Sequence, residues 1–95
     1  MQAIQQQRSV IDELDLELLR LINRRAKAVA EIGRLKRERS LPISDEAREA
    51  AILHALLQSN CGPLNAASLR RIFGAIIAES RRLQHQPAAG ASCTK

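Results

Sequence analysis

The sequence predicts an all-α protein with three helices per chain, in the order long, short and long, that assembles into an oligomer. Residues 4–38 contain no proline and a single glycine, and an apolar seam at helical spacing runs through them. No segment alternates polar and apolar residues as a strand does. A helix of this length measures about 50 Å, too long for a compact monomer of 95 residues. A second chain would cover the protruding part.

The first helix is expected over residues 4–39, because Pro42 cannot continue a helix and Leu41 before it avoids the α region. Ser44 is the expected N-cap of the second helix, which runs to about residue 58 and ends before Gly62-Pro63. Asn65 is expected to cap the third helix, which continues to about residue 86. We assign residues 1–87 to one helical domain and residues 88–95 to a disordered tail.

Composition excludes some classes of function but does not identify the function itself. The net charge of +5 attracts anions in general. Cys61 and Cys93 lack the spacing of a metal site and are interpreted as free thiols in a reducing compartment. The sequence has neither a secretory leader nor an apolar run of membrane-spanning length. We therefore expect a cytoplasmic protein that uses no metal and no membrane.

Polar side chains interrupt both long apolar seams. Arg25 lies on the first seam, Lys36 stands beside its end, and Ser80 and Gln84 interrupt the second seam. Polar groups that point into a helical core are costly unless something pairs with them. The simplest partner is a small anion held inside the bundle. The seams consist of Ile11, Leu14, Leu18, Leu21, Arg25, Ala28, Val29, Ile32 and Leu35, and of Leu69, Ile72, Phe73, Ile76, Ile77 and Leu83.

Helical geometry groups some of these cations and separates one. The 11-residue step from Arg25 to Lys36 leaves an angular offset of about 20° and a separation of about 16 Å. Val29 and Ile32 lie between them and would form an apolar pocket floor, to which we add Ile77. Arg8 lies 17 residues before Arg25, about 25 Å away and rotated by about 100°. If Arg8 serves such a site, the site belongs to a neighbouring chain.

The start of the second helix offers complementary groups. Asp45, Arg48 and Glu49 are spaced at i, i+3 and i+4 and therefore share one face. They supply acceptors for a hydroxyl, another cation and the free N–H groups of a helix start. Each polar feature also has an ordinary explanation, such as a snorkelling arginine, a solvated lysine, a helix cap or hydrogen bonds between helices. Their coincidence favours a binding site.

This ordered set resembles the all-helical AroQ class of chorismate mutases. The matching residues are Arg8, Ile11-Asp12, Asp15, Leu18-Leu19, Arg25, Lys36, Asp45, Arg48-Glu49, Ser80 and Gln84. The resemblance implies an intertwined homodimer in which Arg8 crosses to the partner's site. It implies that Arg25 and the partner's Arg8 bind the carboxylates of chorismate, and that Lys36 and Gln84 hydrogen-bond its ether oxygen.

The resemblance also implies that Glu49 and Asp45 hold the ring hydroxyl, while Arg48 and Ser80 complete the polar lining. The implied reaction is the Claisen rearrangement of chorismate to prephenate in phenylalanine and tyrosine biosynthesis, part of the shikimate pathway, with no cofactor. Arg81 departs from the family, which often has an apolar or small residue there.

Three alternatives stay open. An isochorismate-pyruvate lyase or a mutase of an aminated chorismate would use the same fold. From another class, a dimeric helical nucleic-acid-binding protein would explain the net charge and the basic run at residues 34–39. The absence of aromatic stacking residues and the inward position of Arg25, Ser80 and Gln84 argue against specific nucleic-acid binding. The third alternative is a purely structural dimerisation module, in which inward Arg25 and Gln84 would be costly without benefit.

Overall fold

The computed structural model describes residues 1–85, which form three α-helices and no strand. Helix α1 spans Gln2–Glu38, α2 spans Glu46–Ser59 and α3 spans Ala66–His85. The prediction of an all-α chain with a long, a short and a long helix is confirmed. The predictions for the tail, for Cys93 and for an end of the third helix at residue 86 fall outside the described residues. Within residues 1–85, no helix combines the length and apolarity needed to cross a membrane.

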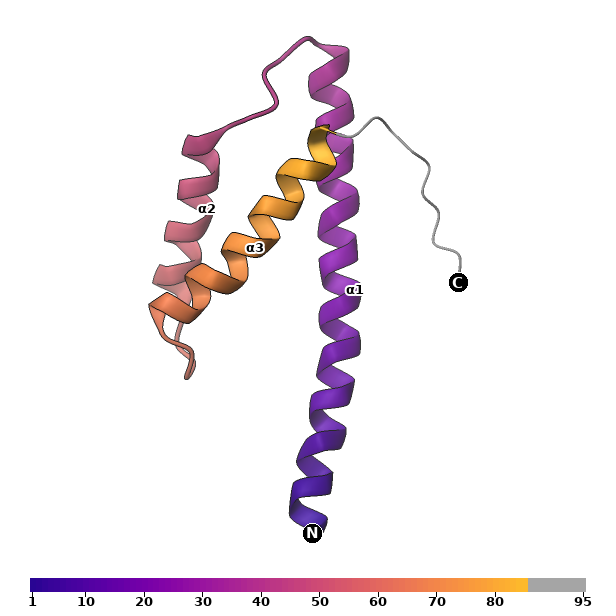
Figure 1. Cartoon of the computed structure of the whole chain (residues 1–95), viewed down its shortest axis with the longest axis vertical. Coiled ribbons are helices and arrows are strands. Elements are labelled where there is room, and N and C mark those ends of the chain that lie inside the picture. Colours follow the sequence, from indigo (N-terminus) through magenta and orange to yellow (C-terminus); the bar gives the residue numbers. More distant parts are fainter. Residues whose placement is uncertain (86–95) are drawn as a thin grey trace.

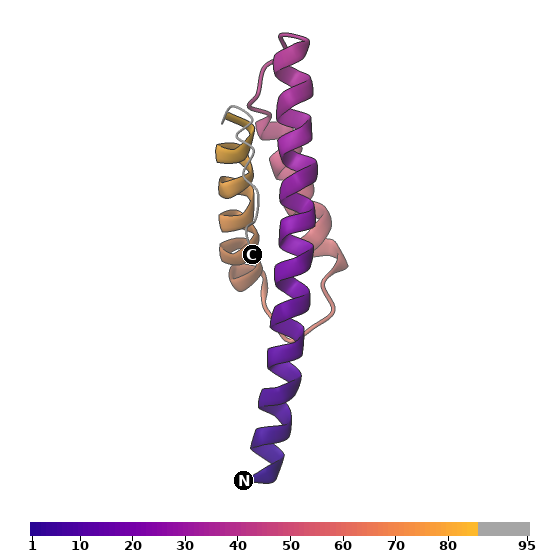
Figure 2. The same cartoon turned by 90° about the vertical axis from the view of Figure 1, so that its right-hand side faces the viewer.

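Helix α1 is the spine of an elongated molecule that measures 57 × 35 × 15 Å. Helix α3 packs across the C-terminal half of α1 and also contacts α2, whereas α1 and α2 do not approach each other closely. The N-terminal end of α1 extends beyond both other helices, as Figure 1 and the perpendicular view in Figure 2 show. The C-terminal half is therefore the part of α1 around which a site is built.

Helix α1 ends in a tight turn that redirects the chain toward α2. The backbone N–H of Leu41 donates to the carbonyl of Lys36 at 2.8 Å, and that of Ser40 donates to Arg37 at 3.2 Å. This is the Schellman pattern, which needs a left-handed residue after the helix. Ser40 takes that conformation, with φ of 56°. Pro42 follows directly, so the break predicted from proline lies in the right place.

The N-cap of α2 differs from the prediction. We predicted Ser44, but the carboxylate of Asp45 caps the helix and accepts a hydrogen bond from the backbone N–H of Arg48 at 3.0 Å. Both residues have capping side chains, and the path of the preceding loop decides between them. The predicted cap of α3 is present, because Asn65 Oδ1 accepts from the N–H of Ser68 at 2.8 Å.

The core of the single chain is thin. Val29, Leu69 and Ile77 are its buried apolar side chains, at 7–8% exposure, and in the described part of the chain no large side chain is fully buried. The N-terminal part of the α1 seam is open instead. Its apolar residues there, Ile11, Leu14, Leu18 and Leu21, are 50–54% exposed. The seam thus has a C-terminal half against which α3 packs and an N-terminal half that stays about half exposed.

Candidate active site

A cavity of about 290 Å³ lies between α1 and the start of α2, with α3 as its third wall. It gathers residues from three segments that are distant in sequence, within residues 25–36, 43–52 and 77–84. Those that line it are Arg25, Val29, Ile32, Lys36, Ile43, Asp45, Arg48, Glu49, Ile52, Ile77, Ser80, Arg81 and Gln84. Because α3 contacts both other helices while α1 and α2 stay apart, the fold leaves this space open between them.

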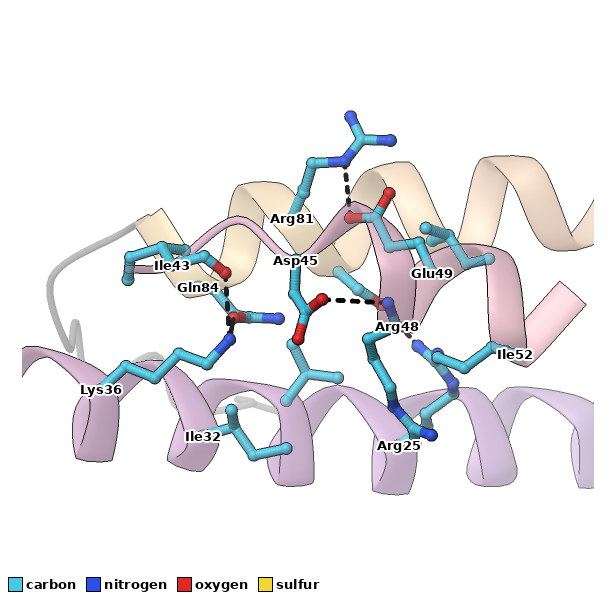
Figure 3. A pocket seen from close by; sticks show the side chains of 13 residues that line it. Arg25, Ile32, Lys36, Ile43, Asp45, Arg48, Glu49, Ile52, Arg81 and Gln84 are labelled. Carbon is cyan, nitrogen blue, oxygen red and sulfur yellow. Dashed lines mark hydrogen bonds and ion pairs between the residues drawn. The ribbon is translucent and has the colours of Figure 1, made fainter. Parts of the chain in front are cut away.

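Two cations from α1 stand along this cavity, with apolar side chains between them (Figure 3). Arg25 is half-buried, and its Nη1 donates a hydrogen bond to Ser80 Oγ on α3. The Ser80 hydroxyl in turn donates to the carbonyl of Ile76 at 2.9 Å. Ser80 is itself buried, so this chain of hydrogen bonds fixes the guanidinium of Arg25 at one end of the cavity.

Lys36 occupies the other end. Its Nζ donates to the backbone carbonyl of Ile43 at 3.0 Å and approaches Oε1 of Gln84 at 3.5 Å. An ammonium group has three donors and no acceptor, so the oxygen of the Gln84 amide must face it. The amide nitrogen is then left as a donor, and Figure 3 shows it directed along the cavity, away from Lys36.

The start of α2 brings both signs of charge to the rim. Glu49 is half-buried and forms an ion pair with Arg81, in which its Oε2 accepts a hydrogen bond from Arg81 Nε at 2.9 Å. Figure 3 shows Arg81 extending away from α1 to make this contact. Four cations and two carboxylates line the cavity, which leaves two formal positive charges. Such a site suits a small ligand with two negative charges.

The structure brings together every site residue predicted from the sequence except one. Arg8 lies on the projecting half of α1, is exposed and does not line the cavity. Sequence reasoning missed Ile43 and Ile52. Ile52 lies four residues after Arg48 on the same helical face, a spacing that would have identified it. The contribution of Ile43 is a backbone carbonyl, which no sequence pattern indicates.

The fold and the cavity define a class of protein: an all-helical chain with a cation-rich cavity between its helices, whose charge suits a small anion. The pattern of the family described as chorismate mutase type II matches residues 7–85. The chain belongs to this family, as its sequence predicts.

Known proteins agree with this assignment. The chorismate mutase of Thermus thermophilus, in the structure called Form II, superposes with a TM-score of 0.85 and 37% identity, over 87% of this chain and 94% of that one. A bifunctional chorismate mutase/prephenate dehydratase of Neisseria gonorrhoeae is 38% identical over 72 residues, 76% of this chain and 19% of that protein.

The T-protein of Haemophilus influenzae is 32% identical over 87 residues, which are 90% of this chain and 23% of the T-protein. The chain therefore spans between 17% and 23% of the length of the curated relatives it matches.

Proposed function

We propose that this chain catalyses the rearrangement of chorismate to prephenate. The observation that carries the proposal is the pairing of Lys36 with Gln84 at one end of a cavity whose other end holds Arg25. Family membership and the named activities of the solved relatives support it. The reaction needs no nucleophile or proton transfer, so an inventory of fixed cations and a neutral donor is sufficient.

The positions of Arg25, Lys36 and Gln84 in the cavity support a separate role for each in catalysis. Arg25, held by Ser80, would bind a carboxylate and keep the flexible dianion in the compact conformer that the Claisen rearrangement requires, an orientation effect. As the C–O bond breaks, negative charge develops on the ether oxygen. Lys36 and the amide nitrogen of Gln84 would stabilise that charge, because both are donors already fixed before reaction.

The rim would hold the ring hydroxyl. Glu49 keeps one carboxylate oxygen unbonded while the other accepts from Arg81, so it can still accept a hydroxyl proton. Asp45 uses one oxygen in its cap and has a second available. Arg48 would add a cation near the substrate. The apolar floor of Val29 and Ile77, both buried, would contact the ring carbons and exclude water.

We propose further that the active form is an intertwined homodimer. The support is the open half of α1, where large apolar side chains from Ile4 to Ile22 are 45–66% exposed. A second apolar hollow of about 180 Å³ lies between α1 and α3, lined in part by Ile22, Ala26 and Leu83, and begins where this exposed stretch ends. A partner helix packed there would bring its Arg8 toward a cavity that the chain's own Arg8 does not line.

A complementation experiment tests the shared site. Arg8→Ala and Arg25→Ala should each lose nearly all mutase activity. Mixing the two proteins under conditions that exchange subunits should restore part of it, because a mixed dimer contains one intact site. If verified heterodimers recover no activity, Arg8 does not act across the interface.

The assay of wild-type protein decides the reaction itself. Chorismate absorbance should decrease, and acid treatment should convert the product to phenylpyruvate. A lyase acting on isochorismate would release pyruvate instead, which a lactate dehydrogenase assay detects. Absence of turnover with a folded protein would contradict the proposed function.

The pathway assignment follows from the product, since prephenate leads to phenylalanine and tyrosine. Three of the relatives join the mutase to a prephenate dehydratase by name. A cytoplasmic location completes the proposal. Its support is the membership of the chain in this family of enzymes.

The structure weakens the nucleic-acid alternative. Within the basic run, Arg34 pairs with Glu31 at 2.7 Å and with Glu38 at 3.1 Å. The same hydrogen bond from Arg34 lowers the pKa of Glu31 below its ordinary value. The run is thus partly neutralised within its own helix. Duplex DNA should bind weakly and be released above physiological salt, and nanomolar sequence-selective binding would contradict this view.

A further inference from the structure

Helices α1 and α3 come into very close contact at Gly33. This glycine lies in the interior of α1, where glycine is disfavoured relative to alanine. Its backbone does not explain its presence, because no glycine in the described residues has a positive φ. Gly33 is instead buried, together with Val29, on the face that α3 covers. The reason for a glycine here must be space.

The neighbour that occupies this space is Gln84. A Cβ atom added to residue 33 would lie 2.9 Å from the Cα of Gln84 and 3.0 Å from its carbonyl oxygen. Both are backbone atoms, so no rotamer change can relieve the overlap. Carbon atoms pack at about 3.5–4.0 Å. A methyl group at residue 33 would therefore displace this end of α3 by about 0.5–1 Å.

A second contact fixes the same residue. One turn after Gly33, the Nη1 of Arg37 donates to the backbone carbonyl of Gln84. That carbonyl lies in the last turn of α3, where carbonyls lack partners within the helix and a cation is favourable. Two residues of α1 thus define the backbone position of Gln84. The side chain of Gln84 meets Lys36 at one end of the cavity.

We propose that Gly33 is a positioning residue for catalysis: its missing side chain sets how closely Gln84 approaches α1, and Arg37 holds it there. The inference rests on the proposed mutase function. Functional groups need to be placed to within about 0.5 Å, and an error of about 1 Å can reduce a rate about 100-fold. Gly33 is not among the residues that line the cavity. It acts only through the residue it allows to come close.

The first test is Gly33→Ala in the full chain, with circular dichroism and sedimentation to establish a folded, unaltered assembly. The kcat should fall about 10- to 100-fold. The KM should change far less, because Arg25 and the α2 start are not displaced. The matched control is Gly74→Ala in α3, where an added Cβ meets nothing within 4 Å. This control should keep the wild-type kcat.

A double-mutant cycle separates positioning from general packing. In a Gln84→Ala background the displaced amide is absent, so adding Gly33→Ala should lower kcat by no more than about twofold. An equal effect of Gly33→Ala in both backgrounds would show that it acts elsewhere and would overturn the inference. So would a folded Gly33→Ala protein that keeps more than half of the wild-type kcat.

If Gly33→Ala does not fold, Arg37→Ala decides the matter, because its exposed side chain can be removed without creating an overlap. We expect a folded protein with kcat reduced several-fold, and no further reduction when it is combined with Gln84→Ala. An unchanged kcat would overturn the inference. Failure of the proposed function is a separate result, since it would appear as inactivity of the wild-type chain.

Discussion

The two halves of α1 share one apolar seam but have different surroundings. In the N-terminal half the seam is regular and uncovered, with Leu14 at 52% and Leu18 at 54% exposure. In the C-terminal half the seam contains Arg25 and ends beside Lys36, yet α3 packs against it and Val29 is buried there, while Ile32 stays 45% exposed at the cavity. Among residues 1–85, the regular half of the seam stays about half exposed, whereas α3 packs against the irregular half.

This contrast shows how an apolar pattern and its interruptions report different things. An unbroken seam predicts that a helix face will be buried, without saying by what. Polar residues on the seam are costly inside a core, so they mark the place where burial serves a ligand. In this chain the interrupted part of the seam lines the cavity, and we propose that the unbroken part forms an interface between subunits.

The largest expected effect comes from charging the regular half. Leu14→Glu combined with Leu18→Glu should abolish the proposed dimer and all measurable activity, because unpaired carboxylates buried in its interface would be strongly unfavourable. Sedimentation at micromolar concentration and unfolding at several protein concentrations would measure this, since a dimer's stability depends on concentration. The control is Leu16→Glu, which lies about 160° around the helix from both and should leave the dimer intact.

Equal disruption by Leu16→Glu would mean that the seam is not the interface. A stable folded monomer of the wild-type chain would be still more decisive, because it would remove both the dimer and the shared site. The two halves of α1 would then differ only in their neighbours within one chain.

The next effect concerns the irregular half. Lys36→Ala should lower kcat/KM by at least about 1,000-fold, because one fixed donor to a developing oxyanion contributes roughly 100- to 1,000-fold and Lys36 adds a full charge. Lys27→Ala, an exposed lysine of the same helix, should change kcat/KM by less than about twofold. Circular dichroism should show both variants folded. If Lys36→Ala kept a tenth of the wild-type value, its assigned role would be wrong.

Much of this contrast could be predicted from the sequence, since helix periodicity and proline positions are local properties. The side chains on helices could be grouped by angle alone, as for Arg25 and Lys36. What could not be predicted depends on tertiary structure. The carbonyl of Ile43 reaches Lys36 only through the path of a loop. From the sequence alone, Gly33 is only a residue that disfavours the helix. The close approach of α3 that explains it is visible only in the structure.

The cap of α2 and the rim show the same limit. Ser44 and Asp45 are chemically equivalent candidates for an N-cap, and only the loop geometry selects Asp45. The sequence identified Arg81 as a departure from the family but gave no direction for its side chain. The contact with Glu49 supplies that direction.

An intermediate fall in kcat/KM is expected for Gln84→Glu. This substitution keeps the shape of the side chain but replaces the amide N–H donor with a carboxyl group that donates only when protonated. The reference pKa of a glutamate is about 4.3, so at pH 7.5 it would present a negative charge to the ether oxygen. We expect kcat/KM to be reduced about 100-fold at pH 7.5. It should recover toward low pH by up to about tenfold per unit, as the donating, protonated form becomes populated.

The wild-type rate should stay nearly constant between about pH 5 and 8, because no histidine or cysteine is among the described residues that line the cavity. The measurement is kcat/KM against pH for both proteins, with circular dichroism at each pH. Parallel profiles would show that residue 84 does not contact the ether oxygen, and the site would have to be drawn without α3.

The smallest expected effect is for Arg81 at the rim of the cavity. Replacing it shows how far the site extends from the irregular half of α1. Its ion pair with Glu49 joins side chains that are 48% and 24% exposed, and exposed pairs contribute about 1 kcal/mol or less, about fivefold in affinity. Arg81→Leu removes one of the cavity's four cations, so KM for a dianion should rise by two- to fivefold, in line with that estimate. The kcat should stay the same, because Arg81 extends away from the end where Lys36 and Gln84 lie (Figure 3). Salt should also weaken binding less in the variant than in the wild type.

Arg82→Leu is the control, since Arg82 pairs with Glu79 and does not line the cavity. A tenfold fall in kcat for Arg81→Leu would place the rim among the groups that stabilise the transition state, and the boundary between the reacting end and the rim would have to move outward.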